Sequence, residues 1–489
     1  MDPITLQVML GALRSACDEM GAVLVRSAHS ANIKERRDSS TALFDPDGQM
    51  VMQAEHIPVH LGAMPSAVAA VRDREQRPGD TWILNDPYRG GTHLPDITLI
   101  SPVFSAGELI GFAANRAHHA DVGGRTPGSM PADSRRLDEE GVVIPPSLLA
   151  DELIDSLSGR MRNPGQRRAD LRAQLAANRT GAARLTALAS RHGSKLLREA
   201  MDATLDYAER RTRAQLAELP NGECTAADVL EGAEGDLELR LRATVRGDEL
   251  ELDFEGSATQ HDGNLNCPLA VTLSACYFAV RVLADPDVPP CAGAWRPVTV
   301  RAPAGSLLNA RPPAAVAAGN VETSSRVADL VLAAFGCALG QGTMNNLTLG
   351  NDHFTYYETL GGGQGACPDA PGPSGVHVAM SNTLNTPLEA LELEFPLRAV
   401  EYSLRRGSGG PGTQRGGDGV VRELEALEPM DYSLITERRR HEPPGAAGGG
   451  NGRAGRNLLN GEELEAKAAG SLRAGDRLRI ETPGGGGYG

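Results

Sequence analysis

The chain has 489 residues, and its 63 acidic against 48 basic side chains give a net charge of −15 at pH 7. Such a chain repels polyanions, which argues against nucleic acid or an anionic membrane surface as a partner. With 40% apolar residues it has ample material for a core, and no apolar run approaches the length of a transmembrane helix. The first ten residues lack the pattern of a signal peptide, and the seven cysteines form no CxxC pair. We therefore expect a cytoplasmic protein with reduced, mostly buried thiols.

The first half of the chain predicts a helix followed by short strands. Asp2 can cap a helix that ends near Ser27 to Ser30, and residues 31–62 suit a hairpin around the turn DPDG. PGDTWIL and DITLISPVF suit strands on either side of the polar loop NDPYRGGTHLP, and GELIGFAANRAHH suits another strand. Polar loops between strands are where binding and catalytic residues concentrate.

Beyond residue 150 the hydrophobic period changes. Residues 163–190 and 194–218 have helical spacing, whereas LELRLRATV and DELELDF alternate strictly and predict a hairpin. Residues 268–284 and 322–340 are apolar enough for buried helices, and from 345 onward strands and glycine turns dominate. The predicted class is α+β (mixed α/β). We expect three parts: 1–150, a helical segment 151–220, and a β-rich part 221–489 intertwined with the first.

Six of the eleven histidines fall within the first 119 residues, at positions 29, 56, 60, 93, 118 and 119. His93 and Asp96 form an H-x-x-D pattern, His118 begins the string HHAD, and Asp38 ends ERRD. Neutral imidazole and carboxylate together suit a divalent transition metal such as Zn, Mn or Fe. On pattern alone the alternative stays open that each histidine is a hydrogen-bonded structural residue.

Other motifs carry less information. The sequence has no G-x-x-x-x-G-K-[ST] phosphate loop, no H-E-x-x-H and no G-x-S-x-G. Two G-x-G-x-x-G strings, at 407–412 and 450–455, lie in glycine-rich surroundings without a flanking strand and helix, so we interpret them as turns. The basic run 437–441 is interpreted as a solvated or partner-facing surface.

Long motifs identify a resemblance over essentially the whole chain. They include SANIKERRDSSTALFDPDGQMVMQAEHIPVHLGAMP, ANRAHHADVGGRTPGSMP, DFEGSATQHDGNLNCP, GNVETSSRVAD, RRGSGGPGTQRGGDGVVRE and the terminal TPGGGGYG. The chain resembles the hydantoinase B family, which includes N-methylhydantoinase B subunits, one half of 5-oxoprolinase and the metal-bearing subunit of acetone carboxylases. It departs from the family at Ser39, where Phe is usual, and at Cys291, where Asn is common.

The resemblance implies one subunit of an ATP-dependent hydrolase of cyclic amides or imides. A hydantoinase A-like ATPase subunit would bind ATP and phosphorylate the substrate, and this chain would hydrolyse the phosphorylated intermediate within a hetero-oligomer. The family's ligand pattern falls on His93, Asp96 and His118, with Asp38 as the candidate fourth ligand. His119 and Asp121 would orient ligands or substrate. Glu55 is the candidate general base, with His56 or His60 nearby.

Three other functions remain open from the sequence. The chain could belong to an ATP-dependent ketone carboxylase, although 489 residues are few for that type. It could be a non-catalytic assembly subunit, which predicts no bound metal. It could also be a self-sufficient metallohydrolase, which predicts ring opening without ATP. The substrate itself, whether hydantoin, 5-oxoproline or another lactam, is not identified by any motif.

Overall fold

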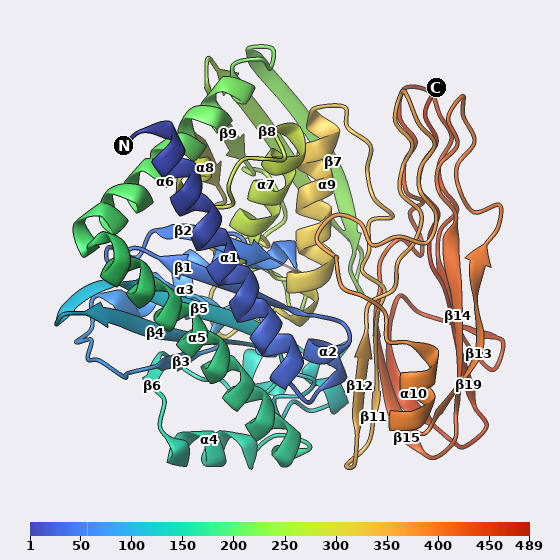
Figure 1. The fold of residues 1–489 in the computed structure, drawn as a ribbon. Coiled ribbons are helices and arrows are strands. Elements are labelled where there is room, and N and C mark those ends of the chain that lie inside the picture. Colours follow the sequence, from blue (N-terminus) through green and yellow to red (C-terminus); the bar gives the residue numbers. More distant parts are fainter. Residues whose placement is uncertain (56) are drawn as a thin grey trace.

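The computed structural model describes residues 1–55 and 57–489, with Glu55 described by its backbone alone. Within these residues the chain forms four β-sheets with helices packed on them, which confirms the mixed α and β class (Figure 1). The search for a membrane-crossing helix among the described residues finds none of sufficient length and apolarity. The predicted division at residues 150 and 220 stays a prediction.

The N-terminal half contains a six-stranded sheet in the order β2-β1-β5-β4-β3-β6. Its strands are β1 Ser39–Phe44, β2 Met50–Glu55, β3 Trp82–Leu84, β4 Asp96–Ser105, β5 Glu108–His118 and β6 Ser147–Leu148. The DPDG turn joins β1 and β2 as predicted, and each neighbouring pair is antiparallel. The long hairpin β4–β5 forms the centre of this sheet.

Helices cover both faces of this sheet. On one face lie the long helices α1 Pro3–Ser27, α5 Pro164–His192 and α6 Ser194–Leu216, whose apolar residues form a core with Leu43 and Val103. On the other face α3 Ala63–Arg72 packs against Phe44 and Phe112. Alternate strand residues thus serve two cores, as the period of two dictates. Asp2 caps α1 as expected, its side chain accepting from the backbone N–H groups of Ile4 and Thr5.

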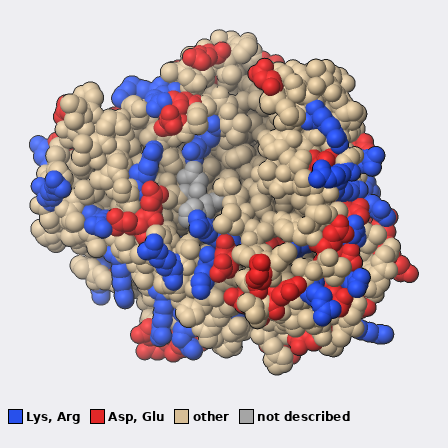
Figure 2. All heavy atoms as spheres, turned by 45° about the vertical axis from the view of Figure 1, so that its right-hand side comes forward, with Lys and Arg blue, Asp and Glu red and all other residues tan. Residues whose placement is uncertain are grey.

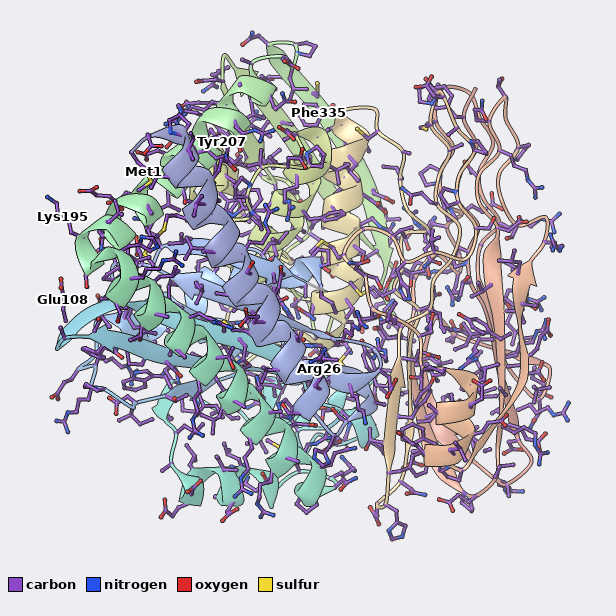
Figure 3. All side chains as sticks on the ribbon, viewed as in Figure 1. Met1, Arg26, Glu108, Lys195, Tyr207 and Phe335 are labelled. Carbon is purple, nitrogen blue, oxygen red and sulfur yellow. The ribbon has the colours of Figure 1, made fainter. Side chains whose placement is uncertain are left out.

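Short helices complete the loops around the sheet. They are α2 Ala31–Lys34, η1 Pro58–His60, η2 Pro87–Arg89, η3 Pro127–Ser129, η4 Leu137–Glu139 and α4 Asp151–Ser158. Figure 3 shows Glu108 at the outer tip of the β4–β5 hairpin. The loops that precede β4 and follow β5 therefore lie at the opposite, inner end of the sheet, which is where the polar residues singled out above are located.

The middle of the chain builds a four-stranded sheet in the order β10-β9-β8-β7. Its strands are β7 Gly222–Glu231, β8 Asp236–Arg246, β9 Glu249–Asp253 and β10 Val298–Arg301. Helices α7 Leu269–Leu283 and α9 Ser324–Ala334 pack on it and form the largest apolar core, and α8 Ala292–Trp295 contacts α6. A π-helical turn, η5 Gly319–Thr323, leads directly into α9. The predicted hairpin and both buried helices are confirmed, although the second is shorter than 322–340.

The C-terminal part is a sandwich of two sheets, ordered β12-β11-β15-β18 and β13-β14-β19-β16-β17. One core is shared by residues of both sheets, among them Leu349, Leu434, Leu424 and Ile480. The elements are β11 Asn346–Gly350, β12 Thr355–Glu358, α10 Leu388–Glu394, β13 Leu397–Arg405, β14 Gly419–Ala426, β15 Met430–Ile435, β16 Arg456–Leu459, β17 Glu462–Leu464, β18 Lys467–Leu472 and β19 Arg477–Glu481.

Beyond the sandwich, extended glycine-rich segments lie side by side and reach toward the C-terminus at the upper right of Figure 1. We call residues 361–365, 407–419, 445–455 and 483–487 the glycine layer. Their backbones are joined directly: Gly485 N donates to Gly417 O at 2.9 Å, and Gly487 N donates to Gly450 O at 2.8 Å. A Cβ atom on Gly485 would lie 2.1 Å from the backbone of Gln364. The absence of side chains is what permits this packing.

The interpretation of residues 437–441 as a surface is wrong for the first two. Glu437 is fully buried, and Arg438 is 3% exposed and pairs with Asp228. Only Arg440 and His441 extend far enough to pair with the partly exposed Asp236. Buried charges occur where partners are present, and partners distant in sequence cannot be read from a local run. On the face in Figure 2, basic and acidic side chains are interspersed instead of separated.

Candidate metal centre

Three candidate ligands lie in one row across the inner end of the six-stranded sheet. Asp96 begins β4, His118 ends β5, and the two are direct partners in the antiparallel register. The backbone N–H of His118 also donates to the carbonyl of Asp38, just before β1, at 3.0 Å. Directly opposite residues on neighbouring antiparallel strands project to the same face. Strand pairing therefore brings together residues that are up to 80 positions apart in sequence.

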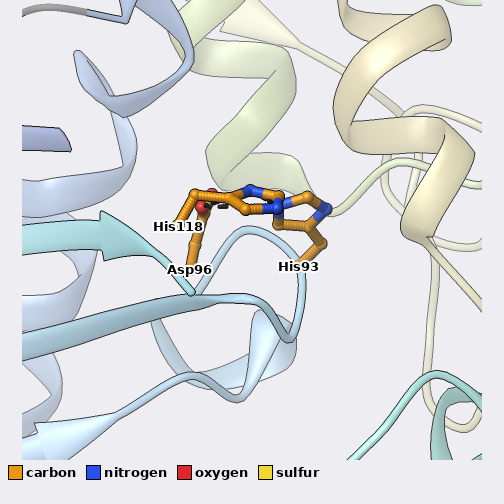
Figure 4. A group of neighbouring side chains, drawn as sticks. All are labelled: His93, Asp96 and His118. Atoms are coloured by element: carbon orange, nitrogen blue, oxygen red, sulfur yellow. Dashed lines mark hydrogen bonds and ion pairs between the residues drawn. The ribbon is translucent and has the colours of Figure 1, made fainter. Parts of the chain in front are cut away.

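His93 completes the cluster from the loop before β4. Its Nε2 lies 3.2 Å from Nδ1 of His118 and 3.3 Å from Oδ1 of Asp96, and His118 Nδ1 lies 3.4 Å from the same oxygen. Figure 4 shows the two rings approaching each other from opposite sides. All three side chains are buried. The three donor atoms form a nearly equilateral triangle.

The triangle has the dimensions of one face of a metal coordination shell. Metal–nitrogen distances of about 2.0–2.1 Å in a tetrahedron place neighbouring ligand atoms about 3.3 Å apart. The chemistry of the donors fits as well, because two imidazoles and a carboxylate suit Zn, Mn or Fe. The residues present thus fit a divalent cation, and the geometry does not distinguish among these three metals.

A second group, Asp38, His60 and Asp96, adjoins the first. His60, in η1, places Nε2 at 3.4 Å from Oδ2 of Asp96, while its Nδ1 shares a hydrogen bond of 2.9 Å with Ser40 Oγ. Apart from this contact with Asp96, Nε2 of His60 has no polar partner among the described residues. Metal-binding histidines are commonly oriented in this way through the other ring nitrogen. Asp38 Oδ2 lies farther out, 4.0 Å from Nδ1 of His118.

Burial sets the protonation of this cluster. Burial lowers the pKa of His118 to about 3 and also lowers that of His60, which favours the neutral imidazole that a metal requires. Burial raises the pKa of Asp96, but the charge interaction with His93 and hydrogen bonds to His118 and His60 outweigh it and hold that pKa well below its usual value. Burial raises the pKa of Asp38 to about 7, with Arg36 opposing the rise.

The wall behind His118 comes from the C-terminal half. The Tyr357 ring stacks on the His118 ring with centroids 4.6 Å apart, and its hydroxyl donates to Asn346 Oδ1 at 2.8 Å. The guanidinium of Arg36 lies 4.6 Å from the centre of the same tyrosine ring and donates to Oγ1 of Thr359. The two halves of the chain therefore meet at this cluster.

These residues line a small cavity of about 20 Å³, which has room for about one water molecule. Its lining residues are Asp38, Ile57, Val59, His60, His93, Asp96, His118, Asn320, Val321, Met344, Tyr357, Thr359, Met380, Ser381 and Thr383. The lining thus combines imidazole and carboxylate groups, hydroxyl groups and apolar side chains.

The other predicted site residues are placed differently. His119 and Asp121 are buried but do not line the cavity: His119 Nε2 shares a hydrogen bond with Gln174 Oε1, and Asp121 accepts from Arg162 and from the backbone of Gly128. His119 thus contacts α5, and Asp121 contacts the segment just before that helix. The side chain of Glu55 and all of His56 lie outside the described residues, so the general-base assignment stays a prediction.

The sequence comparison shows to which family the chain belongs. A family model described as hydantoinase B/oxoprolinase matches residues 2–489. The chain belongs to the hydantoinase B/oxoprolinase family. It is 40% identical over 529 aligned positions to 5-oxoprolinase 1 of Arabidopsis thaliana, covering all of this chain and 42% of that protein. The chain thus spans about two fifths of the length of the 5-oxoprolinases it matches.

Solved structures agree with this family assignment. The crystal structure of an ATP-dependent caprolactamase from Pseudomonas jessenii matches with a TM-score of 0.93 and 29% identity, over all of this chain and 91% of that one. A nucleotide-free acetone carboxylase matches with a TM-score of 0.89 and 18% identity, over all of this chain and 76% of that one, which shows the shared fold alone. The same fold therefore occurs in a caprolactamase and in an acetone carboxylase.

Sequence reasoning missed some residues of the cavity. From the sequence, His60 has no role beyond lying near Glu55, although Pro58 favours the tight turn η1 that contains it. Asn320 lies in GNVETSSRVAD, a motif that carried the family resemblance, and Tyr357 lies in β12, and neither position has a local sign of a site. Only the packing of the two halves brings them to the histidines.

Proposed function

We propose that this chain is the metal-bearing hydrolytic subunit of an ATP-dependent enzyme that opens a cyclic amide or imide, such as a hydantoin, 5-oxoproline or another lactam. A hydantoinase A-like ATPase subunit is its partner in a cytoplasmic hetero-oligomer and activates the substrate with ATP. The observation that carries the proposal is the buried triangle of His93, Asp96 and His118 inside a chain of this family.

We assign His93, Asp96 and His118 as ligands of a divalent cation, with Asp38 as a fourth. His60 is added to the candidates because its buried Nε2 faces Asp96 and has no other partner in the described part of the chain. When bound, a divalent cation supplies Lewis-acid activation of water or of a carbonyl. The protein supplies a dry enclosure, which protects an activated intermediate from bulk solvent.

The reaction divides between the two subunits. In the partner, the γ-phosphoryl group of ATP is transferred to the amide oxygen and the amide N–H proton is released, which leaves a C=N bond without amide resonance. In this chain, water adds to the activated carbon, the C–N bond breaks, and both protons of that water end on the departing nitrogen. A second water then cleaves the resulting acyl phosphate to carboxylate and phosphate. In the tautomer that donates Nδ1–H to Ser40, the Nε2 lone pair of His60 is available either to the cation or to a proton inside the cavity, but not to both.

The test is to produce the chain together with an A-type ATPase subunit, measure bound metal, and assay phosphate release and ring opening over a lactam panel. We expect stoichiometric metal and ring-opened product from the wild type. Asp96→Ala should lose metal and product while the partner still consumes ATP. Asp236→Ala, a partly exposed aspartate that also pairs with a histidine, is the matched control and should keep both.

The alternatives predict different results. A purely structural subunit leaves ring opening intact in Asp96→Ala, and a self-sufficient hydrolase opens the ring without ATP or partner. A ketone carboxylase consumes bicarbonate with a ketone and leaves every lactam unchanged. Any of these three results would refute the proposed hydrolysis by two subunits.

A further inference from the structure

Arg36 is a buried cation whose direct partners are all neutral. It lies just after α2 and is fully buried. Its guanidinium donates to the carbonyl of Tyr357 and to the hydroxyls of Thr359 and Thr383, and its Nε has no hydrogen-bond partner among the described residues. Buried charges are normally paired with an opposite charge, because burial removes their hydration. The charge of Arg36 acts on Asp38, but that carboxylate is assigned to the metal. Within the described chain, Arg36 therefore has no anion as a direct partner.

Thr359 and Thr383 have one hydroxyl proton more than their contacts use. Nη2 of Arg36 donates to Oγ1 of Thr359 at 2.9 Å and to Oγ1 of Thr383 at 3.1 Å, and the two hydroxyl oxygens are 2.8 Å apart. One hydroxyl therefore donates to the other, and the second keeps a proton for which the described residues supply no acceptor. Both threonines line the cavity. A hydroxyl donor backed by a guanidinium suits an anionic oxygen.

Hydrogen bonds between distant segments fix the positions of the two threonines. Thr359 directly follows β12, and its carbonyl accepts from Asn385 Nδ2 at 2.8 Å. Leu384 N donates to the carbonyl of Arg36 at 3.1 Å, which joins the segment that contains Thr383 to the segment after α2. The hydroxyls are therefore held in place before a ligand arrives, which lowers the cost of binding it.

We propose that Thr359 and Thr383, with the guanidinium of Arg36 behind them, form an oxyanion subsite that binds the phosphoryl group of the activated substrate. This inference rests on the proposed function, in which both the phosphorylated imidate and the acyl phosphate carry that group. The C–N bond breaks while the bond from carbon to the phosphoryl oxygen persists. The subsite thus retains the acyl phosphate after the ring has opened, until the second water cleaves it.

The position of the threonines favours a phosphoryl group over a carboxylate elsewhere on the ring. The threonines and the three metal ligands line the same cavity of about 20 Å³, so an anion held by the hydroxyls lies next to the atom that water attacks. With a divalent cation present, that cation and Arg36 carry more charge than Asp96 and Asp38 offset, which favours an anion. A phosphoryl group needs more than this volume, so the cavity has to widen, and the methionines in its lining adapt their shape readily.

The test measures binding of inorganic phosphate by calorimetry to the metal-loaded complex with its A-type partner. A non-hydrolysable ATP analogue fills the partner's nucleotide site, so that only phosphate bound elsewhere is detected. Combining Thr359→Val with Thr383→Val removes both hydroxyls and keeps the side-chain shapes, and phosphate binding should weaken about tenfold or more. Thr383→Ser retains the hydroxyl and should bind phosphate like the wild type. Thr386→Val is the matched control, because this buried threonine lies outside the cavity lining and its hydroxyl has no partner in the described chain.

A second measurement compares phosphate released with ring opened, for a lactam that has no carboxyl group. The two amounts should be equal in the wild type. In the double valine variant the phosphorylated intermediate escapes, so phosphate released should exceed ring opened at unchanged metal content. Undetectable phosphate binding in the wild type, equal binding in the variant, or a defect confined to lactams with a carboxyl group would overturn the phosphoryl subsite and leave the proposed function intact. A wild type that binds phosphate through these threonines yet opens no cyclic amide would refute the proposed function and support the oxyanion site.

Discussion

The metal cavity and the glycine layer are built in opposite ways. In the cavity, side chains from distant segments converge, and the fold is specified by what each side chain contacts. In the glycine layer, backbones pack directly, and the fold is specified by what is missing: a Cβ on Gly417 would lie 1.8 Å from Pro373 O. One region therefore tolerates conservative changes that retain donors and acceptors, whereas the other tolerates almost no added atom.

This difference predicts which variants lose function and which lose the fold. Removing a polar atom from the cavity leaves the backbone unchanged, because the strands β1, β4 and β5 are held by their own ladder. Adding a methyl group to the glycine layer forces apart several segments that share hydrogen bonds. We expect cavity variants to lose metal or substrate but remain folded, and glycine-layer variants to lose the fold.

The largest effect is expected from Gly485→Ala. The added methyl would lie 2.1 Å from the backbone of Gln364, where no flexible side chain can move aside. We expect destabilisation of more than about 4 kcal/mol, seen as loss of soluble protein or a large fall in unfolding temperature.

Gly11→Ala is the control for this change. Gly11 lies on the exposed face of α1 with nothing within 4 Å of an added Cβ, so alanine should stabilise the helix by about 0.8–1.0 kcal/mol. If Gly485→Ala unfolds at the wild-type temperature, the segments of the glycine layer can move apart to admit a methyl group. The claim that this layer tolerates fewer changes than the cavity would then be wrong.

Much of the architecture follows from local signals in the sequence. The Asp2 cap, the DPDG turn, the strict alternation in β8 and β9 and the helical spacing of α5 and α6 each depend on near neighbours, and each prediction is confirmed. Met50, Met52 and Met64 are fully buried, as their apolar surroundings indicate.

The site was only partly predictable, because its decisive contacts are not local. The spacing of His93, Asp96 and His118 matched the family pattern, but the row that aligns Asp96 with His118 depends on strand register. The burial of Glu437 depends on Lys467 and Arg326, which pair with it from other elements. No local pattern records such partners, which is why that residue was assigned to the surface.

A smaller effect is expected from Ser40→Ala in the cavity. This change removes the hydrogen bond to Nδ1 of His60 and frees the ring to rotate. If His60 takes part in the site, metal affinity or kcat/KM should fall about tenfold with no loss of fold. Ser39→Ala is the matched control, since the neighbouring buried hydroxyl has no partner among the described residues. Equal behaviour of the two variants would remove His60 from the site.

The smallest effect is expected at Glu322, in the turn η5 that also contributes Asn320 and Val321 to the cavity lining. This fully buried carboxyl in η5 accepts from Met344 N and Asn346 Nδ2, while its Oε2 has no partner in the described chain. Burial, together with the nearby charge of Glu437, raises its pKa from 4.5 to about 8. The folded chain thus retains a proton that the unfolded chain releases above pH 4.5. The contribution of Glu322 to stability therefore falls as the pH rises from 4.5 to about 8 and is constant above that.

Glu322→Gln removes this titration and keeps both accepted hydrogen bonds. We expect the variant to match the wild type near pH 5 and to be more stable by about 1 kcal/mol or more near pH 8.5, measured as unfolding temperature across that range. Exposed Glu108→Gln should show no such pH-dependent gain. A variant less stable than the wild type at every pH would mean that Glu322 is ionised and paired when folded. The turn that holds Asn320 would then depend on a buried charge instead of a neutral hydrogen bond.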